Sequence, residues 1–257
     1  LSGASLSLLL VFRTNAAYSR WDQARKAWGA VVNNSRNLCR MAGTWVTEDV
    51  EPSPIKRKYH IKLMTDRVWA FARSLQRHLI GESEDGETFI RDVRGRVPDI
   101  AEGLIVARHK PTIAATELGK AINEMPMGYL RRLEIDKSVI AFCDAMGACD
   151  RIFTSPIPLV YTRHTARFLG GWMLTLPFGM YTVFGDSWNH LAEVPVIAVV
   201  SFFLFGIEEL AIQLEEPFSI LPLTTIVGGI GKSADEAVQW HFDGSDESTQ
   251  HQQQLWP

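Results

Sequence analysis

FLGGWMLTLPFGMYTVF, residues 168–184, and VPVIAVVSFFLFGI, residues 194–207, are two apolar runs that contain no charged residue. A short polar segment, residues 185–193, joins them. Two uncharged runs on either side of a tight polar turn are typical of helices that cross a lipid bilayer and return. We therefore predict an all-α polytopic membrane protein with a transmembrane hairpin over residues 166–210.

A third uncharged run, LSGASLSLLLVF, occupies residues 1–12. As a helix it would span about 18 Å at about 1.5 Å per residue, less than the hydrocarbon core of about 30 Å. Because the sequence starts inside this pattern, with Leu rather than Met, we interpret the run as the end of a membrane helix. We expect an N-terminal part upstream with at least one more hydrophobic segment. A buried helix of a soluble protein is the alternative that the length leaves open.

Basic residues next to these runs indicate an orientation. Those that follow the first run or precede the hairpin are Arg13, Arg20, Arg25, Lys26, Arg36, Arg40, Arg151, Arg163 and Arg167. The hairpin turn holds only acidic charges, Asp186 and Glu193. Positive side chains near membrane ends favour the cytoplasmic type of compartment. Residues 13–165 and 211–257 are therefore predicted to form a cytosolic or stromal layer, and residues 1–257 a single domain.

Helical periodicity fills most of this polar layer. Apolar residues at helical spacing predict helices over 15–45, 56–79, 112–124 and 126–152. Prolines predict a break at 51–54 and a corner at 155–158, because each Pro biases the preceding residue away from the helix. The acidic, Gly-containing segment 81–95 is predicted to be an exposed loop. The polar tail after Trp240 is predicted to be disordered.

Charge and cysteine usage exclude two functional classes. The net charge of −3 argues against a nucleic-acid partner, because such proteins normally carry a basic excess. The three cysteines, Cys39, Cys143 and Cys149, form no CxxC pair and no even disulfide set. We interpret them as reduced packing residues rather than a redox site.

Catalytic motifs are missing from the sequence. It contains no GxSxG, no P-loop and no pair of histidines at HxxxH or HExxH spacing. His60, His78 and His109 lie among polar helix residues, which favours a solvated or capped imidazole over a metal ligand. Gly228-Gly-Ile-Gly231 is interpreted as a helix-breaking turn because it lacks a flanking strand. We therefore predict no enzyme activity, no cofactor and no metal.

Paired acids follow the second hairpin run at Glu208-Glu209 and Glu215-Glu216. Adjacent carboxylates point in different directions on a helix, but residues seven apart share a face. Ionisable residues at the end of a membrane run usually face protein or water. We favour anchoring of this helix end to the basic helices over direct handling of ions.

The opening run carries one apolar stripe, because Ala4, Leu8 and Phe12 are spaced four residues apart. Periodicity alone favours core packing for such a stripe. Channels also use narrow hydrophobic constrictions that gate by dewetting. A stripe of this kind surrounded by symmetry-related copies would form such a constriction.

The continuation of this run resembles the bestrophin family, above all its bacterial, fungal and plastid branches. Those branches show F-R-x-N-x-x-Y-x-R-W followed by a basic, Trp-containing helix and V-x-x-S-R-x-L. The matching residues here are Phe12, Arg13, Asn15, Tyr18, Arg20, Trp21, Arg25, Trp28, Gly29, Ser35, Arg36 and Leu38. Further matches are IPLVY with its preceding Pro156, Leu176-Pro-Phe-Gly179, and FGIEELAIQLEEPFSILPL at residues 205–223.

The resemblance implies a homopentamer with a central ion pathway. In the family, three apolar residues at four-residue spacing line a hydrophobic neck, and they fall here on Ala4, Leu8 and Phe12. Ala4 is smaller than the usual residue, so we expect a wider outer neck. The family also has a cytosolic aperture, which counting back from the IPLVY-like corner places at Val139, with Ile140 the adjacent candidate.

Calcium activation is not expected from this resemblance. Animal bestrophins bind Ca²⁺ with an acidic cluster directly after an N-P-F-type motif, whereas Glu216-Pro-Phe218 is followed by uncharged residues such as Leu221 and Thr224. A hard cation needs about six to eight oxygen ligands, usually including carboxylates. We therefore predict a channel without that clasp.

The predicted function is passive, selective flow of chloride, bicarbonate or nitrate across a lipid bilayer. A cation channel on the same fold and a membrane-anchored helical scaffold that conducts nothing are the alternatives. The motif at residues 207–223 most resembles that of thylakoid chloride channels. A plastid thylakoid membrane is therefore favoured, with a bacterial inner membrane as the alternative.

Overall fold

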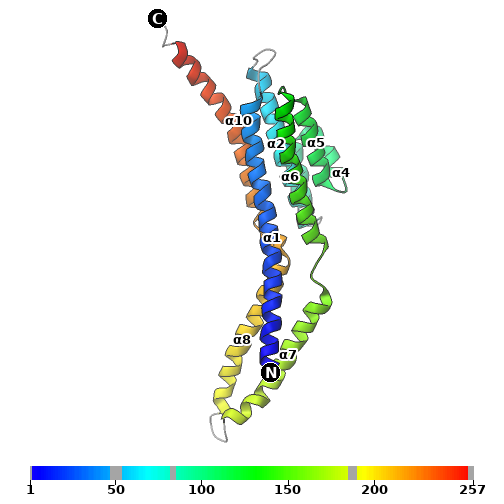
Figure 1. The fold of residues 1–257 in the computed structure, drawn as a ribbon, viewed down its shortest axis with the longest axis vertical. Coiled ribbons are helices and arrows are strands. Elements are labelled where there is room, and N and C mark those ends of the chain that lie inside the picture. The colour runs from blue at the N-terminus through cyan, green and yellow to red at the C-terminus, as the bar shows by residue number, and fades with distance from the viewer. Residues whose placement is uncertain (1, 47–53, 82–84, 185–189, 254–257) are drawn as a thin grey trace. The chain divides into compact units, whose positions relative to one another are not determined.

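The computed structural model describes residues 2–46, 54–81, 85–184 and 190–253, and all regular structure in these ranges is helical (Figure 1). The all-α prediction is therefore confirmed. The helices are α1 (Ser2–Trp45), α2 (Pro54–Ile80), α3 (Gly86–Arg96), α4 (Pro98–Val106), α5 (Lys110–Glu124), α6 (Tyr129–Thr154), α7 (Leu159–Phe184), α8 (His190–Glu215), α9 (Pro217–Ile220) and α10 (Leu223–Gln253).

Helix α1 joins the opening apolar run to the basic helix that follows it. Its 44 residues contain no Pro, and at about 1.5 Å per residue they extend over about 66 Å. The predicted corner is confirmed, because α6 ends at Thr154 and α7 begins at Leu159. The other predicted break, at 51–54, lies outside the described residues except for Pro54, which begins α2.

Three local predictions are wrong. The predicted loop at 81–95 contains most of α3, which buries Phe89 and Val93 on one face and places charged residues between them. The sequence concealed this helix because its buried face has only these two positions, four residues apart. Helix α10 passes through Gly228–Gly231 without a turn, and it continues to Gln253, where a disordered tail was predicted.

The chain forms two compact units. Unit 1 consists of residues 1–25 and 151–221, and unit 2 of residues 26–150 and 222–257. In unit 1 the first part of α1 packs against α7 and α8, with Leu6, Leu10, Leu169 and Met173 as its core.

In the described part of the chain, one helix is long and apolar enough to cross a membrane, Leu191–Glu215 in α8. The other arm of the predicted hairpin, α7, falls short of this measure. Its uncharged run contains two adjacent glycines and Pro177, and Arg163 and Arg167 precede the run within the same helix.

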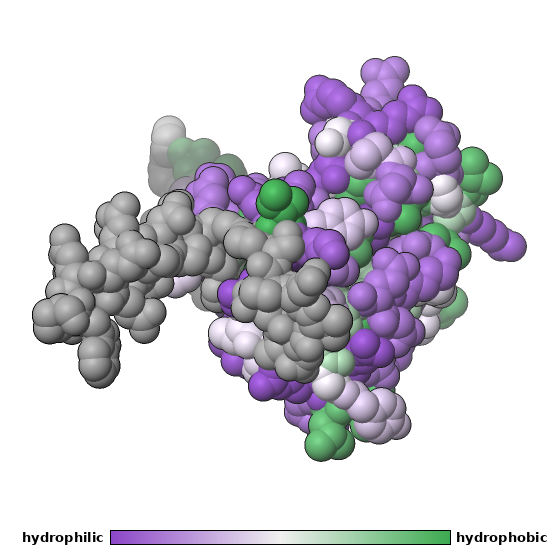
Figure 2. Space-filling view, turned by 90° about the horizontal axis from the view of Figure 1, so that it is seen from above, coloured by the Kyte–Doolittle hydropathy of each residue, from purple (hydrophilic) through white to green (hydrophobic). Residues whose placement is uncertain are grey.

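Unit 2 is built around α2, which lies between α5 and α10. The apolar positions that periodicity assigned to one face of α2 are buried, and Phe71 stacks on Phe142 of α6 with ring centroids 4.5 Å apart. Figure 2 looks onto the end of the molecule that carries α2, α5 and α6, where the described surface is mostly hydrophilic. Unit 2 therefore combines an apolar interior with a mostly polar surface on the face seen in Figure 2.

Candidate functional site

The predicted neck residues lie on an exposed face of α1. Ala4, Leu8 and Phe12 are all exposed in the chain, Leu8 to 57% and Phe12 to 58%. Successive members of the stripe are rotated by about 40° around the helix, because residues follow one another at about 100°. Packing inside the chain, which periodicity alone favoured, therefore does not account for these three side chains.

The opposite face of α1 determines which way the stripe points. Leu6 and Leu10 are buried against Leu169 and Met173 of α7, and Leu204 of α8 packs against the same cluster. A helix with one face fixed in this way cannot rotate without exposing its buried leucines. The outward direction of the stripe is thus a consequence of packing within unit 1.

A buried ion pair fixes α1 to α8, and its arginine directly follows the apolar run of residues 1–12. The guanidinium Nη1 of Arg13 donates to Oε1 of Glu208, and both side chains are almost fully enclosed. Their second polar atoms, Nη2 and Oε2, have no hydrogen-bond partner among the described residues. Removal of two charges from water is costly, so each depends on the other. The prediction that Glu208 anchors its helix end to the basic helices is confirmed.

Arg20 supplies a second anchor, made to backbone carbonyl groups. Its Nε donates to the carbonyl oxygen of Glu215 over 2.8 Å, and its Nη1 donates to that of Ser155 over 2.7 Å. Its Nη2 donates to the carbonyl oxygen of Ile152. These oxygens belong to the last turns of α6 and α8 or just follow them, where carbonyl groups lack helical partners. Burial lowers the pKa of Arg20, and the carboxylates of Glu215 and Glu216 oppose this effect.

The two anchors share one spacing. Arg13 and Arg20 are seven residues apart on α1, as are Glu208 and Glu215 on α8, and the two helices run parallel in unit 1 (Figure 1). Seven residues make about two helical turns, so both contacts lie on the same pair of facing surfaces. Sequence reasoning identified the spacing of the acids but not the matching spacing of the arginines, which was the signal for this pairing.

The two aperture candidates in α6 differ in their environment. Val139 is 9% exposed and belongs to the core of unit 2, whereas Ile140 is 55% exposed. Of the two candidates, Ile140 therefore has the side chain that is accessible in one protomer, and the aperture assignment itself stays a prediction. Adjacent residues of a helix point about 100° apart, so a counting error of one position exchanges a surface residue for a core residue.

The segment after Glu216 is used for packing. Thr224 Oγ1 accepts a hydrogen bond from Gln76 Nε2 of α2 over 3.0 Å. Phe218 is buried in unit 1, and Glu216 itself is exposed. The absence of a Ca²⁺ clasp stays a prediction.

The buried thiols match their interpretation as packing residues. Burial raises the pKa of Cys39 and of Cys149 to about 12, so neither is a reactive thiolate near neutral pH. Cys143 is exposed, and all three cysteines are free.

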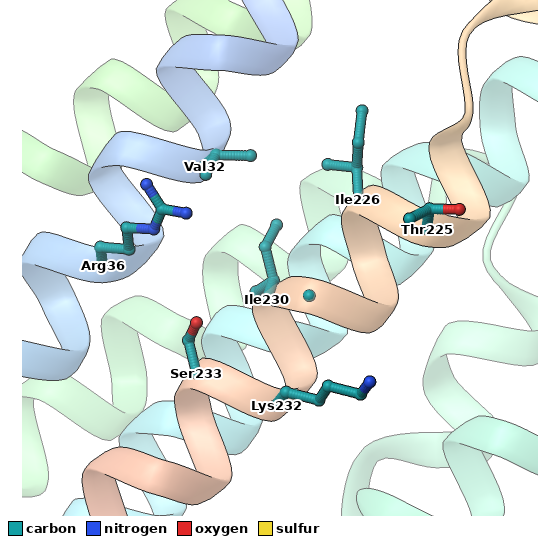
Figure 3. Close-up of a pocket in the computed structure, with 8 residues that line it drawn as sticks. Val32, Arg36, Thr225, Ile226, Ile230, Lys232 and Ser233 are labelled. Carbon is teal, nitrogen blue, oxygen red and sulfur yellow. The ribbon is translucent and has the colours of Figure 1, made fainter.

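A groove of about 370 Å³ lies in unit 2 between α1 and α10 (Figure 3). In Figure 3 the guanidinium of Arg36 points toward α10, and Lys232 points away from α1. Val32, Ile226 and Ile230 give the groove apolar walls. Among the eight described residues that line it, none is Asp, Glu, His or Cys, so the groove offers no side chain for acid–base or metal chemistry.

Comparison with known proteins places this geometry in a family context. The family model described as "Bacterial/Fungal Bestrophin protein" matches residues 1–236. "Voltage-dependent chloride channel 1, chloroplastic" of Arabidopsis thaliana is 31% identical over 242 residues, which cover 93% of this chain and 55% of that protein. "Voltage-dependent anion channel-forming protein alr2987" of Nostoc sp. is 33% identical over 239 residues, 90% of this chain and 74% of that protein. The chain thus spans about half the length of the chloroplastic relative.

Solved structures share the fold. A bacterial bestrophin homologue from Klebsiella pneumoniae superposes with a TM-score of 0.80 at 22% identity, covering 93% of this chain and 86% of that chain. A crystal structure described as a membrane protein variant gives a TM-score of 0.81 at 21% identity, with the same two coverages.

Proposed function

Since this chain belongs to the bacterial and fungal bestrophin family, we propose that copies of it assemble around a central axis into an anion channel. The observation that carries the proposal is the exposed apolar stripe Ala4, Leu8 and Phe12 on a helix whose other face is fixed by packing. A side chain that lines a pore must be exposed in the single protomer. This stripe meets that requirement at three successive turns.

Unit 1 supplies the membrane layer in this proposal. Many large apolar side chains on α7 and α8 are exposed in the chain, and hydrocarbon is the solvent that suits them. They include Leu174, Phe178, Val194, Val199, Phe202 and Phe203. Unit 2 supplies the water-soluble layer on the stromal or cytosolic side, in keeping with its polar surface. The chloroplastic and cyanobacterial relatives favour a thylakoid membrane over a bacterial inner membrane.

The neck would form where five copies bring their α1 stripes together. A ring of Phe12 and a ring of Leu8 make an apolar constriction, which favours ions that lose water at low cost. The ring of Ala4 is wider. Chloride is the proposed ion, with nitrate and bicarbonate as further candidates, because relatives carry the names chloride channel and anion channel. Flow is passive and uses no covalent chemistry.

Ile140 is the better candidate for the second apolar ring, at the cytosolic aperture. Its side chain is exposed on α6, whereas Val139 is occupied by packing in unit 2. Five copies of Ile140 facing one axis would narrow the water-filled part of the pathway. Conductance would then depend on two apolar rings from two helices, Phe12 of α1 and Ile140 of α6.

Purified protein in planar bilayers tests the proposal. With asymmetric chloride, the reversal potential is expected near the chloride equilibrium potential, and removal of Ca²⁺ is expected to leave the current intact. Phe12→Ala is expected to change open probability or the order of anion permeabilities. Val11→Ala is the matched control, because Val11 is also exposed, at 54%, but lies about 100° from Phe12 on the helix.

Four results would contradict the proposal in different ways. A reversal potential near the cation equilibrium potential would indicate a cation channel on the same fold. Absence of current together with a mass below five subunits would indicate a helical scaffold. Equal currents from wild type and Phe12→Ala would remove the neck assignment, and equal currents from wild type and Ile140→Ala would remove the aperture assignment.

A further inference from the structure

Two histidines and one aspartate from separate segments of unit 2 meet at one point. His78 lies near the end of α2, His109 directly precedes α5, and Asp150 lies in α6. Nε2 of His78 is 2.9 Å from Oδ1 of Asp150, and Nε2 of His109 is 3.3 Å from Oδ2 of the same carboxylate. The two imidazole ring centroids are 4.5 Å apart. No part of the proposed ion pathway uses these side chains.

The spacing of these donor atoms suits a small divalent ion. One donor atom from each residue lies within 4.8 Å of the other two. Zinc binds imidazole nitrogen and carboxylate oxygen at about 2.0–2.2 Å in tetrahedral geometry, which places neighbouring donor atoms about 3.3–3.5 Å apart. The Nε2 atoms of His78 and His109 lie 2.9 and 3.3 Å from different oxygen atoms of the Asp150 carboxylate, distances close to that spacing, and a bound ion would draw both imidazoles toward one carboxylate.

A hydrogen bond behind the cluster orients one of the ligands. Nδ1 of His109 is 2.7 Å from the hydroxyl oxygen of Thr112, in the first turn of α5. When a neutral His109 donates Nδ1–H to that hydroxyl, its Nε2 carries the lone pair that faces the Asp150 carboxylate and is available to bind a metal ion. Metal-bound histidines usually have their second ring nitrogen held in this way.

We propose that His78, His109 and Asp150 bind one transition-metal ion per chain, with zinc as the best-fitting member of the class. Two nitrogen ligands and one carboxylate suit zinc, nickel or cobalt, whereas magnesium and calcium prefer sets made of oxygen alone. All three side chains are partly exposed, which leaves a route for the ion and a fourth position for water. A bound ion would link α2, α6 and the segment before α5, and so stabilise unit 2.

The test is zinc binding to metal-free full-length chain in detergent, measured by competition with a chromophoric chelator. One zinc per chain is expected for the wild type. His109→Gln and Asp150→Asn are each expected to weaken binding by about tenfold or more. His164→Ala is the matched control, because His164 is an exposed histidine of α7 outside the cluster. Cobalt should give the visible absorption of a tetrahedral site in the wild type and in His164→Ala only.

Thermal unfolding provides a second measurement that does not depend on the chelator. Zinc is expected to raise the Tm of wild type and of His164→Ala, because a ligand bound only by the folded state stabilises it. At the same zinc concentration the shift should be smaller in the two cluster variants, and magnesium should produce none. Lack of zinc binding by wild type, equal binding by the cluster variants, or binding lost on alkylation of Cys143 would each overturn the proposal.

Discussion

In unit 1 many large apolar side chains of α7 and α8 point outward, whereas in unit 2 most of those of α2 are enclosed by other helices. Phe202 of α8 is 76% exposed, while Phe71 of α2 is fully buried against Phe142. Charged residues differ as well. Unit 1 encloses the pair Arg13 and Glu208 next to its apolar core, whereas the buried arginines of α2 in unit 2, such as Arg67 and Arg73, pair with acids at the surface of other helices or before them.

This difference indicates two different solvents for one chain. Burial of apolar area stabilises a protein only when the alternative is water. Hydrocarbon around unit 1 would remove the free-energy cost of exposing its outward-facing apolar side chains. Side chains of the same kind in unit 2 must be buried. This comparison of the two units leads to four predictions, each of which alters residues in one or both units.

The largest effect is expected from breaking the enclosed pair of unit 1. Glu208→Gln leaves Arg13 charged and without a carboxylate, and such a loss costs about 3–5 kcal/mol of unfolding free energy. Unfolding in detergent, followed by circular dichroism, measures the change. Glu209→Gln is the control, since Glu209 is the adjacent residue and is exposed. Equal stability of the two variants would mean that the pair does not anchor α1 to α8.

Truncation of an aromatic side chain should cost more stability in unit 2 than in unit 1. Phe71→Ala removes a fully buried ring that stacks at 4.5 Å on Phe142, and is expected to cost about 3–5 kcal/mol. Phe202→Ala is expected to cost less than about 1 kcal/mol, because an exposed side chain leaves no cavity. Denaturant titration of both variants in the same detergent compares them. A large loss for Phe202→Ala would indicate that another copy of the chain covers this face.

The glycines of α10 test how closely this helix packs in unit 2. A Cβ atom at Gly231 would lie 3.1 Å from Cδ1 of Trp69 and 3.3 Å from Nη1 of Arg96, so Gly231→Ala is expected to destabilise by about 1–3 kcal/mol. Gly228→Ala meets nothing within 4 Å and is expected to stabilise the helix by about 0.5–1 kcal/mol. The Tm of each variant shows whether the substitution stabilises or destabilises the protein. A gain in both would mean that Trp69 and Arg96 move aside freely.

The smallest effect is expected from an ion pair of unit 2, Arg73 with Asp85, because Arg73 keeps a second carboxylate partner in Asp92 when Asp85 is changed. Burial opposes ionisation of Asp85, but hydrogen bonds from Arg73 and Thr88 outweigh it and hold the pKa of this carboxyl below its usual 3.8. A lowered folded-state pKa stabilises the protein above the unfolded pKa, and this stabilisation is lost as pH falls through the folded value. Asp85→Asn should therefore be less stable than wild type near neutral pH, with the gap closing below about pH 4. A gap that stays constant with pH would exclude the ion pair as its source.

Much of the fold followed from local patterns. The corner at 155–158 follows from two prolines, and the helices at 112–124 and 126–152 agree with α5 and α6 to within three residues at each end. Helix α3 was missed because its buried face consists of two positions. The predicted turn at Gly228–Gly231 was wrong because α10 continues through it, and of these glycines Gly231 has a packing role, since it allows α10 to approach Trp69.

For the candidate neck as well, some features follow from the local sequence and others from contacts between distant residues. Spacing alone identified Ala4, Leu8 and Phe12 as one stripe, and the acids at Glu208 and Glu215 as one face. Which way the stripe points depends on the packing of Leu6 and Leu10 against Leu169 and Met173. Which residues of α8 the arginines of α1 contact depends on pairs that are 195 positions apart. The cluster of His78, His109 and Asp150 could not be identified from the sequence either, because its three residues are far apart along the chain.

The sequence by itself determined the helical class, the apolar runs, the spacing of the stripe and the resemblance carried by its continuation. Hydropathy and periodicity depend on the order of residues that are close together in the sequence, so they can be identified without the structure. Only the tertiary structure decided that Leu6 and Leu10 are enclosed while Leu8 and Phe12 are exposed. All four are apolar residues of one helix, and packing against α7 and α8 is what separates them.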